Sequence, residues 1–136
     1  MQVQDVMKGS VVTASEDETI AAAAGKMRDA DVGCVVVVGS ETLRGIITDR
    51  DVTVRCCGAG HNPQECSVAQ HMTSPVTILG PDLDVLEALH LMAVERIKRV
   101  PIMQGAQLVG ILSFSDIAIA LGGPTHDLIQ GMGTVH

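Results

Sequence analysis

Apolar residues follow two kinds of spacing along this chain, and both kinds occur twice. Positions three and four residues apart, as on one face of a helix, are apolar in each half of the chain: Ile20, Ala23, Ala24, Met27 and Val85, Ala88, Leu89, Met92. Nearly continuous apolar runs, rich in β-branched residues, follow each set: 34–38, 43–48, 100–103 and 108–113. We therefore expect, in each half, one helix followed by two strands that a polar turn joins.

Short segments before and after this core complete each half. Residues 11–13 and 76–79 are expected to be extended, and acidic residues follow them as candidate helix N-caps. Ser15 and Glu18 have the spacing of a capping box, and Asp82 follows Pro81. A second, short helix is expected to begin near Asp49 and near Phe114. Each half is thus predicted to be a β-α-β-β-α unit. Since apolar strands such as 35–38 need cover on both faces, the two units are expected to pack together.

The two halves match each other at a constant offset of 65 residues. Identical pairs run along the whole length, as from Met7 to Met72 and from Asp17 to Asp82. The densest match is between GIITDRDV (45–52) and GILSFSDI (110–117), which share Gly, Ile, a hydroxyl residue and an aspartate. Chance does not readily place that pattern twice in one register, so the sequence indicates an internal duplication.

The repeat predicts the boundaries of the domains. The first domain is expected over 1–57, a linker rich in Gly, Asn and Pro over 58–67, and the second domain over 68–121. Gly122, Gly123 and Pro124 are expected to end the last helix. Residues 122–136 form a C-terminal tail, of which 125–136 have no firm pattern, and we expect the tail to fray or to form an oligomer contact.

Composition excludes several classes of function. The chain has one aromatic residue, Phe114, and a formal net charge of −7, which argues against stacking on bases and against binding nucleic acid. No apolar run has the length of a membrane span, and the start of the chain does not resemble a signal peptide. Four cysteines without the spacing of a disulfide framework favour a reducing compartment, so the cytoplasm is expected.

This organisation resembles a tandem pair of CBS domains, a Bateman module, and in particular the small stand-alone prokaryotic CBS-pair proteins. The residues that carry the resemblance are Asp5-Val6-Met7, 45–52, His71-Met72-Thr73, Arg99-Val100-Pro101-Ile102 and 110–117. The resemblance implies an α/β (α+β) fold of two β-α-β-β-α units packed sheet to sheet with pseudo-two-fold symmetry. It also implies a homodimer and a regulatory ligand, AMP, ADP, ATP or S-adenosylmethionine, in clefts between the repeats. No cofactor is required, and the protein partner is unknown.

The hydroxyl and carboxylate shared by the repeats are the first candidate site residues. A hydroxyl at a strand–helix turn can bond a phosphate or sugar oxygen, and an aspartate three residues on can accept both hydroxyls of a ribose. Helix capping is the competing interpretation of the same spacing. With the family resemblance, the ribose interpretation is favoured for Thr48 with Asp51 and for Ser113 with Asp116.

Basic residues near these turns are candidates for binding phosphate: Arg50, Arg55 and Arg99. Surface solubility is a competing explanation for Arg55. Because the bases are placed unequally in the two halves, the two clefts are expected to differ. The resemblance further implies that Thr13 and Thr77 contact adenine, in part through backbone groups.

Two other chemistries are considered and disfavoured. Cys56, Cys57, His61 and Cys66 do not match zinc spacing well, so free thiols and no metal site are predicted. His71 and His90 are interpreted as helix residues rather than ligands. A metal-assisted hydrolase using Asp49 and Asp51 is disfavoured, because only the second aspartate is repeated. The prediction is a non-catalytic sensor; the alternative is a scaffold with degenerate clefts or a metal bound at Cys and His.

Overall fold

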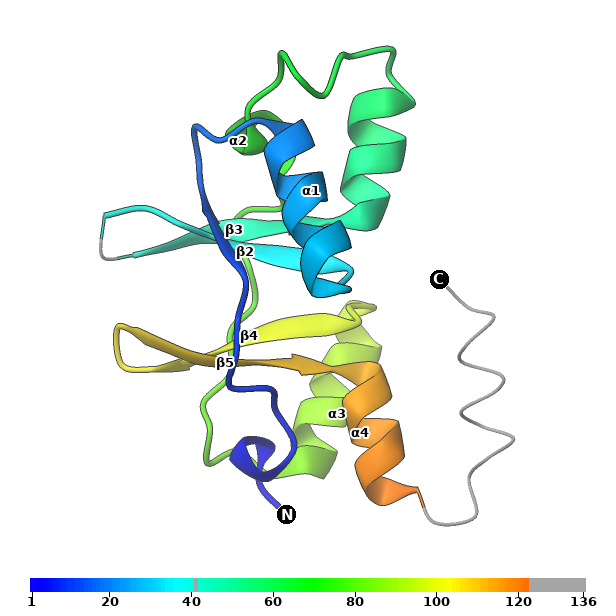
Figure 1. Cartoon of the computed structure of the whole chain (residues 1–136). Helices are drawn as coiled ribbons and strands as arrows, with labels where there is room; N and C mark the ends of the chain where they lie inside the picture. The colour runs from blue at the N-terminus through cyan, green and yellow to red at the C-terminus, as the bar shows by residue number, and fades with distance from the viewer. Residues whose placement is uncertain (41, 123–136) are drawn as a thin grey trace. The chain divides into compact units, whose positions relative to one another are not determined.

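The computed structural model describes residues 1–40 and 42–122 and divides the chain into two compact units (Figure 1). We call residues 11–76 the central unit. The composite unit joins residues 1–10 to the chain from Thr77 onward, so it is built from two separate stretches of sequence. Each unit is described by itself below.

The central unit is a three-stranded sheet with helices. Strand β1 (Thr13–Ser15) is parallel to β2 (Cys34–Val38), and β2 is antiparallel to β3 (Leu43–Thr48). The helical segments are α1 (Ile20–Ala30), the π-helix η2 (Asp51–Cys57) and the short α2 (Val68–His71). Its core takes alternate residues of β2, the apolar face of α1, as the spacing predicts, and one residue of β3: Val35, Val37, Ile20, Ala23, Met27 and Ile47.

The composite unit repeats this plan around a two-stranded sheet. Strand β4 (Arg99–Gln104) is antiparallel to β5 (Gln107–Ser113). The helices are the 3₁₀ turn η1 (Val3–Asp5), α3 (Val85–Glu95) and α4 (Phe114–Leu121). The equivalent helices α1 and α3 both end at a residue with a left-handed backbone, Asp31 (φ 55°) and Arg96 (φ 58°). The predicted duplication is therefore confirmed in the conformation of the chain as well as in its sequence.

The segment that begins each repeat packs against the strands of the other repeat. In the composite unit, the amide of Val3 donates to the carbonyl of Leu83 (2.8 Å), and the amide of Lys8 donates to the carbonyl of Ile111 (2.9 Å). In the central unit, Ile46 and Thr73 exchange two backbone hydrogen bonds, at 3.1 and 2.8 Å. Figure 1 shows the N-terminal segment, in blue, beside β5. The compact units are therefore not the sequence repeats.

The predicted linker lies in the central unit. The amide of Ile20 donates to the carbonyl of Cys66, and the amide of Ala21 donates to that of Pro63, both at 2.9 Å. These bonds fix the segment 58–67 to the start of α1. The predicted boundaries, 1–57, 58–67 and 68–121, mark the repeats in the sequence. That they are also the boundaries of domains stays a prediction. All but residue 122 of the predicted C-terminal tail lies outside the described residues.

The predicted helices and strands are confirmed in order, with four local corrections. Strand β1 begins at Thr13, the last residue of the predicted stretch 11–13. Helix α1 is capped by Thr19, whose Oγ1 accepts from the amide of Ala22 (3.0 Å), and not by Ser15. Helix α3 is capped by Asp84, two residues after the predicted Asp82. The extended stretch 76–79 forms only one parallel bridge, between Leu79 and Ile102, and no strand.

The two cap predictions were wrong because a capping pattern gives spacing but no starting point. Ser15 and Glu18 do bond each other, within the turn that follows β1.

Across the described residues, no helix has the length and apolar character to cross a bilayer.

Candidate functional site

In the central unit, Thr48 and Asp51 lie at the turn from β3 to η2 and bond each other reciprocally. The amide of Thr48 donates to Asp51 Oδ2 (3.0 Å), and the amide of Asp51 donates to Thr48 Oγ1 (3.1 Å). The Asp51 side chain is drawn inward by these bonds, and the residue is only 7% exposed. A carboxylate that is nearly buried and accepts from an amide is a well-positioned acceptor.

Arg55 approaches the same carboxylate from one turn further along η2. Its Nε lies 3.5 Å from Asp51 Oδ1, and its side chain is half exposed. Arg50, by contrast, is exposed at the residue before η2. Of the predicted phosphate-binding residues in this repeat, the structure therefore brings Arg55 to the Thr48–Asp51 turn and leaves Arg50 at the surface.

In the composite unit, Ser113 and Asp116 form the matching turn between β5 and α4. The amide of Asp116 donates to Ser113 Oγ (3.0 Å). The cation beside this carboxylate comes from the other end of the chain: Lys8 Nζ lies 3.8 Å from Asp116 Oδ1. Arg99 stands opposite Ser113 in the β4–β5 ladder. The structure thus places two bases near this turn.

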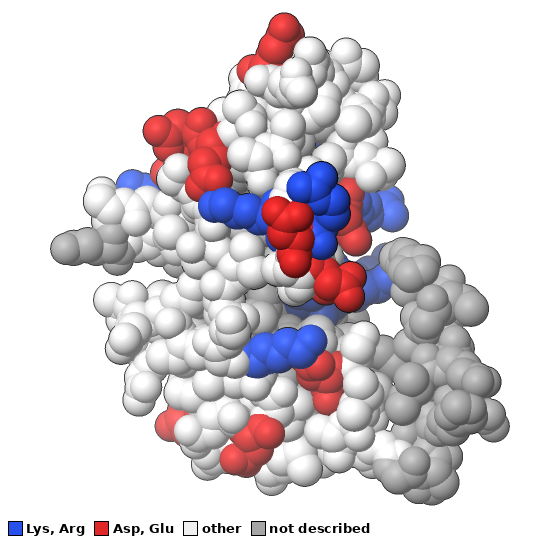
Figure 2. Space-filling view, viewed as in Figure 1, with Lys and Arg blue, Asp and Glu red and all other residues white. Residues whose placement is uncertain are grey.

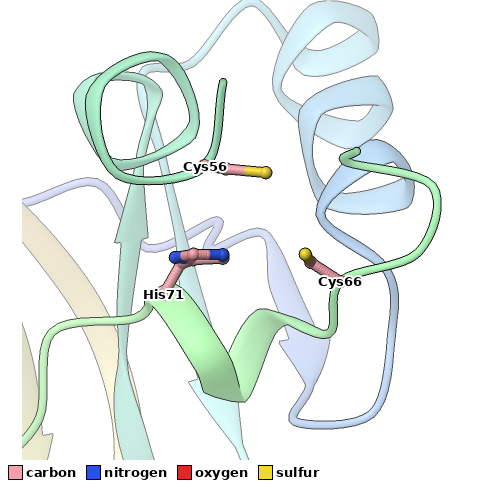
Figure 3. Close-up of side chains that lie close together, drawn as sticks. All are labelled: Cys56, Cys66 and His71. Atoms are coloured by element: carbon pink, nitrogen blue, oxygen red, sulfur yellow. The ribbon is translucent and has the colours of Figure 1, made fainter. Parts of the chain in front are cut away.

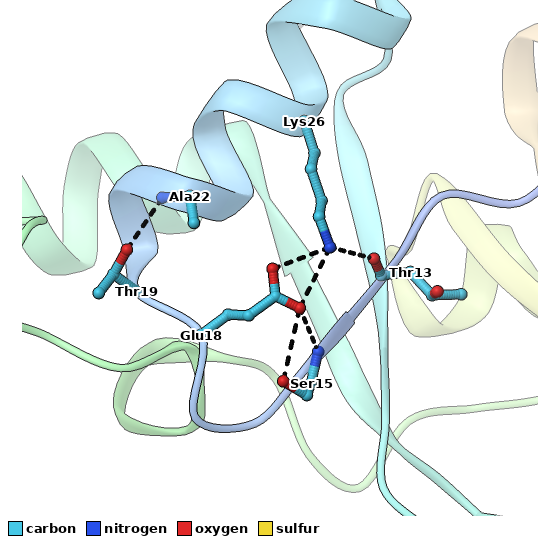
Figure 4. A network of polar contacts seen from close by, with 6 residues as sticks. All are labelled: Thr13, Ser15, Glu18, Thr19, Ala22 and Lys26. Carbon is cyan, nitrogen blue, oxygen red and sulfur yellow. Dashed lines mark hydrogen bonds and ion pairs between the residues drawn. The ribbon is translucent and has the colours of Figure 1, made fainter.

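The two threonines implied for adenine lie in different surroundings. Thr13 begins β1, and its carbonyl accepts a 2.8 Å hydrogen bond from Lys26 Nζ (Figure 4). Thr77 lies outside any strand, and its Oγ1 donates to Glu95 Oε1 (2.9 Å). Both have contacts inside their own unit, and a role toward adenine stays a prediction.

The turn does contain the helix-capping hydrogen bonds that compete with the ribose interpretation. The carboxylate oxygens can nevertheless accept further hydrogen bonds. Each carboxylate oxygen offers two lone-pair positions, and the contacts on Asp51 are one per oxygen. The turn can therefore serve as a cap and still accept hydrogen bonds from a sugar. Capping and binding are compatible functions of the same residues here.

The charged side chains form no broad field on the face drawn in Figure 2. Lys and Arg side chains lie beside Asp and Glu side chains there, within the described residues. This mixture is consistent with the net charge of −7 and suits a small ligand bound by a few placed bases.

A second cluster lies in the central unit. Cys56, Cys66 and His71 come from η2, from the segment before α2 and from α2, and they point toward one another (Figure 3). One ligand-type atom of each lies within 4.8 Å of the other two. Burial raises the pKa of the Cys56 thiol, and the neighbouring Cys66 and Cys57 raise it further. The predicted absence of a metal stays a prediction.

Two residues of these sites were missed by sequence reasoning. His71 is predicted to be a partly buried helix residue, and it is a buried residue of α2; its closeness to two cysteines is not predicted. Lys8 was missed because the exchange of N-terminal segments was not foreseen. The signal for both is the identity of Gly45 and Gly110 between the repeats, since each marks a close approach by the segments that carry Met72 and Met7.

Comparison with known proteins agrees with this geometry. The family description "CBS domain" matches residues 3–56 and 68–123. Hypoxic response protein 1 of Mycobacterium tuberculosis is 31% identical over 128 residues, covering 93% of this chain and 88% of that protein. CBS domain-containing protein YhcV of Bacillus subtilis is 35% identical over 117 residues, covering 86% and 83%.

Solved structures share the fold. A crystal structure of Hypoxic Response Protein I with two coordinated zinc ions has a TM-score of 0.79 at 30% identity, covering 90% of this chain and all of that one. The CBS domain pair of protein MJ0100, in complex with 5′-methylthioadenosine and S-adenosyl-L-methionine, has a TM-score of 0.82 at 24% identity, covering 90% and 97%. The duplicated α-β-β-α plan, the repeated Thr/Ser–Asp turns and these matches lead to one conclusion: the chain belongs to the CBS domain family and carries two CBS repeats.

Proposed function

We propose that this chain is a non-catalytic regulatory module that binds an adenosine-containing ligand, namely AMP, ADP, ATP or S-adenosylmethionine. The observation that carries the proposal is the hydroxyl–carboxylate turn found once in each unit, Thr48 with Asp51 and Ser113 with Asp116. Each turn lies where a strand passes into a helix, so a hydroxyl and a partly buried carboxylate stand close together.

The chemistry of such a turn suits a nucleoside. A carboxylate with unused lone pairs accepts hydrogen bonds from the two hydroxyls of a ribose, and charge strengthens these bonds. Arg55 lies near one turn, and Lys8 and Arg99 lie near the other, as candidates to bind phosphate. Because the bases differ in kind and number, the two sites are expected to prefer ligands of different charge.

A relative guides the choice of ligand. The CBS domain pair of MJ0100 was crystallised with 5′-methylthioadenosine and S-adenosyl-L-methionine. Because that likeness is one of fold, it suggests which compounds to test and does not identify the ligand of this chain. The placement of the ligand between the two repeats stays a prediction.

The regulatory part of the proposal concerns a change of state. A ligand shifts a protein between two conformations only if it binds them with different affinity. We expect a homodimer to couple that shift to a protein partner, with no cofactor required. Four free cysteines favour the cytoplasm as the compartment.

Thermal denaturation in the presence of single ligands tests the proposal. The panel is AMP, ADP, ATP, S-adenosylmethionine and NAD, with guanosine monophosphate as the control for base identity. A ligand at about 100 times its dissociation constant stabilises the native state by roughly 2.7 kcal/mol, which raises the melting temperature by several degrees. If no adenosyl compound raises the melting temperature, the proposed function is wrong.

Variants of the carboxylate separate binding from capping. Asp51→Asn keeps an acceptor for the Thr48 amide and removes the charge, so stability is retained while affinity falls by roughly tenfold. Asp51→Ala also loses the cap, at a cost of about 1 kcal/mol in unfolding free energy. Asp116→Asn is the matched variant of the other turn. Calorimetric titration should show each variant weakening a different site; unchanged affinity in both would contradict the ribose assignment.

A further inference from the structure

Three side chains of the kinds that bind metals lie close together in the central unit. None of them belongs to the proposed nucleotide sites. Cys56 lies in the last turn of η2, Cys66 in the segment before α2, and His71 at the end of α2. Figure 3 shows the two thiols and the imidazole directed into the same space. The ligand-type atoms lie within 4.8 Å of one another.

Burial makes this cluster more than a surface coincidence. Cys56 is 0% exposed and His71 is 8% exposed, and Cys56 belongs to the same apolar core as Val68. An imidazole taken out of water needs polar partners. His71 Nε2 lies 3.3 Å from Nδ1 of a second imidazole, that of His61. The exposed His61 thus places a second imidazole beside the buried His71.

The duplicated fold supplies an internal comparison. At the constant offset between repeats, the positions of Cys56, Cys66 and His71 correspond to Leu121, Met1 and Val6. The composite unit therefore has three apolar residues at the equivalent positions. The fold does not demand cysteine or histidine there, so these residue types in the central unit require a reason of their own.

The donor set selects a class of metal. Two thiolates and one or two imidazoles are the ligands of tetrahedral Zn²⁺. With zinc bond lengths of about 2.0–2.3 Å, the ligand atoms of a tetrahedral site lie roughly 3.3–3.8 Å apart. The 3.3 Å between the two imidazole nitrogens fits two ligands of one ion as well as it fits a hydrogen bond. Cys56, Cys66 and His71 need only small side-chain movements to close on a metal, whereas the His61 side chain would have to turn in toward the two thiols.

We propose that Cys56, Cys66 and His71 bind a zinc ion, with His61 as the fourth ligand. The site is structural, because four protein ligands leave no open position for a substrate. It joins the end of η2 to the segment 58–67 and to α2, and η2 is the helix that begins with Asp51. The ion would therefore fix the helix behind one proposed nucleotide turn, although the zinc site itself does not depend on nucleotide binding.

Metal analysis of the full-length protein tests this site. Protein purified with a non-thiol reductant and without chelator should contain about one zinc ion per chain by mass spectrometry. The variants Cys56→Ser, Cys66→Ser and His71→Ala should lose it. Cys57→Ser and His90→Ala are matched controls, since both residues lie outside the cluster, and they should keep the ion.

Three further measurements test the site even if one of these variants fails to fold. Wild-type protein stripped of metal and titrated with Co²⁺ should develop the intense visible absorption of a tetrahedral cobalt site together with thiolate charge transfer. His71→Cys replaces one zinc ligand by another and should restore the metal. His61→Ala should lower zinc affinity by more than the roughly 10–100-fold typical of losing an outer-shell partner.

Several results would overturn the proposal. Reduced, folded wild-type protein that takes up neither Zn²⁺ nor Co²⁺ has no such site, and a Cys56–Cys66 disulfide in metal-free protein would then explain the pair of thiols. Loss of the ion in Cys57→Ser would show that Cys57 is a ligand, contrary to the proposal. Unchanged affinity in His61→Ala would remove His61 from the ligand set. None of these results bears on the adenosyl ligand.

Discussion

Gly45 is the point where two chain segments in the central unit come closest. A Cβ atom placed on it would lie 2.6 Å from the carbonyl oxygen of Thr73 and 2.9 Å from Met72 Sδ. The backbone of Thr73 cannot withdraw freely, because it exchanges two hydrogen bonds with Ile46. Gly110 has the same position in the composite unit, where the segment of Met7 crosses it. Glycine is needed at both places for close approach rather than for a turn.

Replacing Gly45 with alanine should therefore destabilise the protein. Over-packing of this kind costs about 1–3 kcal/mol in unfolding free energy, and here the neighbour is backbone. Gly25→Ala is the matched control: Gly25 lies inside α1, and a Cβ atom there would have no neighbour within 4 Å, so alanine should stabilise by about 1 kcal/mol. Urea unfolding measures both. A neutral Gly45→Ala would show that the segment of Thr73 can move.

Some residues of the candidate sites could be predicted from the sequence and others could not. Thr48 and Asp51 were found because they repeat, and repetition is visible in one sequence. His71 was not found, because its partner in the other repeat is valine and its neighbours Cys56 and Cys66 are separated from it in sequence. The sequence does group Cys56 and Cys66, at a spacing that fits zinc poorly, but only the folded chain brings His71 to them.

At the scale of elements, a partly buried ion pair connects α1 to the strand before it. Lys26 Nζ on α1 donates to Glu18 Oε2 (3.1 Å) and to the carbonyl of Thr13 at the start of β1 (2.8 Å), as Figure 4 shows. Glu18 also accepts from the amide of Ser15 (2.7 Å). Burial acts to raise the pKa of Glu18, but the bonds from Lys26 and Ser15 outweigh it and hold the pKa below its ordinary value.

This network should make part of the stability depend on pH. Because folding lowers the pKa of Glu18, its contribution is present above the unfolded value and is lost as pH falls through the folded value. Glu18→Gln should cost about 0.2–1 kcal/mol at pH 7 and should change little in acid. Unfolding by urea at a series of pH values measures the difference between the two proteins. A constant difference across that series would show that the charge of Glu18 has no such role.

The Lys26 network has no counterpart in the second repeat. Leu83 and Leu91 stand at the positions of Glu18 and Lys26 at the constant offset. The strand order and helix order could be predicted because apolar spacing is a property of each element alone. The helix start at Thr19 could not, because Glu18 turns back to Ser15 and the chain needs one more residue before the helix begins.

At the scale of the whole molecule, the compact units and the sequence repeats divide the chain differently. Residues 11–76 form one unit without interruption, whereas residues 1–10 belong to the unit that continues from Thr77. A repeat cut from the sequence at residue 57 lacks Thr73 and therefore lacks the segment that crosses Gly45. The duplication was visible in the sequence, but this exchange was not, since both arrangements give the same pattern of apolar residues.

Fragments of the chain should follow the units. A fragment of residues 11–76 should keep more helical circular dichroism and a more cooperative thermal transition than a fragment of residues 1–57. A fragment from residue 77 onward should be stabilised when a synthetic peptide of residues 1–10 is added, because Val3 and Lys8 bond Leu83 and Ile111. A scrambled peptide is the control. Equal behaviour of the 11–76 and 1–57 fragments would contradict this division.

The exchanged segment also sets an order of events during synthesis. Residues 11–76 can close their hydrogen bonds as soon as Val76 has left the ribosome. The first ten residues, made earlier, cannot satisfy the amides of Val3 and Lys8 until Leu83 and then Ile111 have been added. Residues 1–10 must therefore stay without these partners while residues 11–76 can already fold.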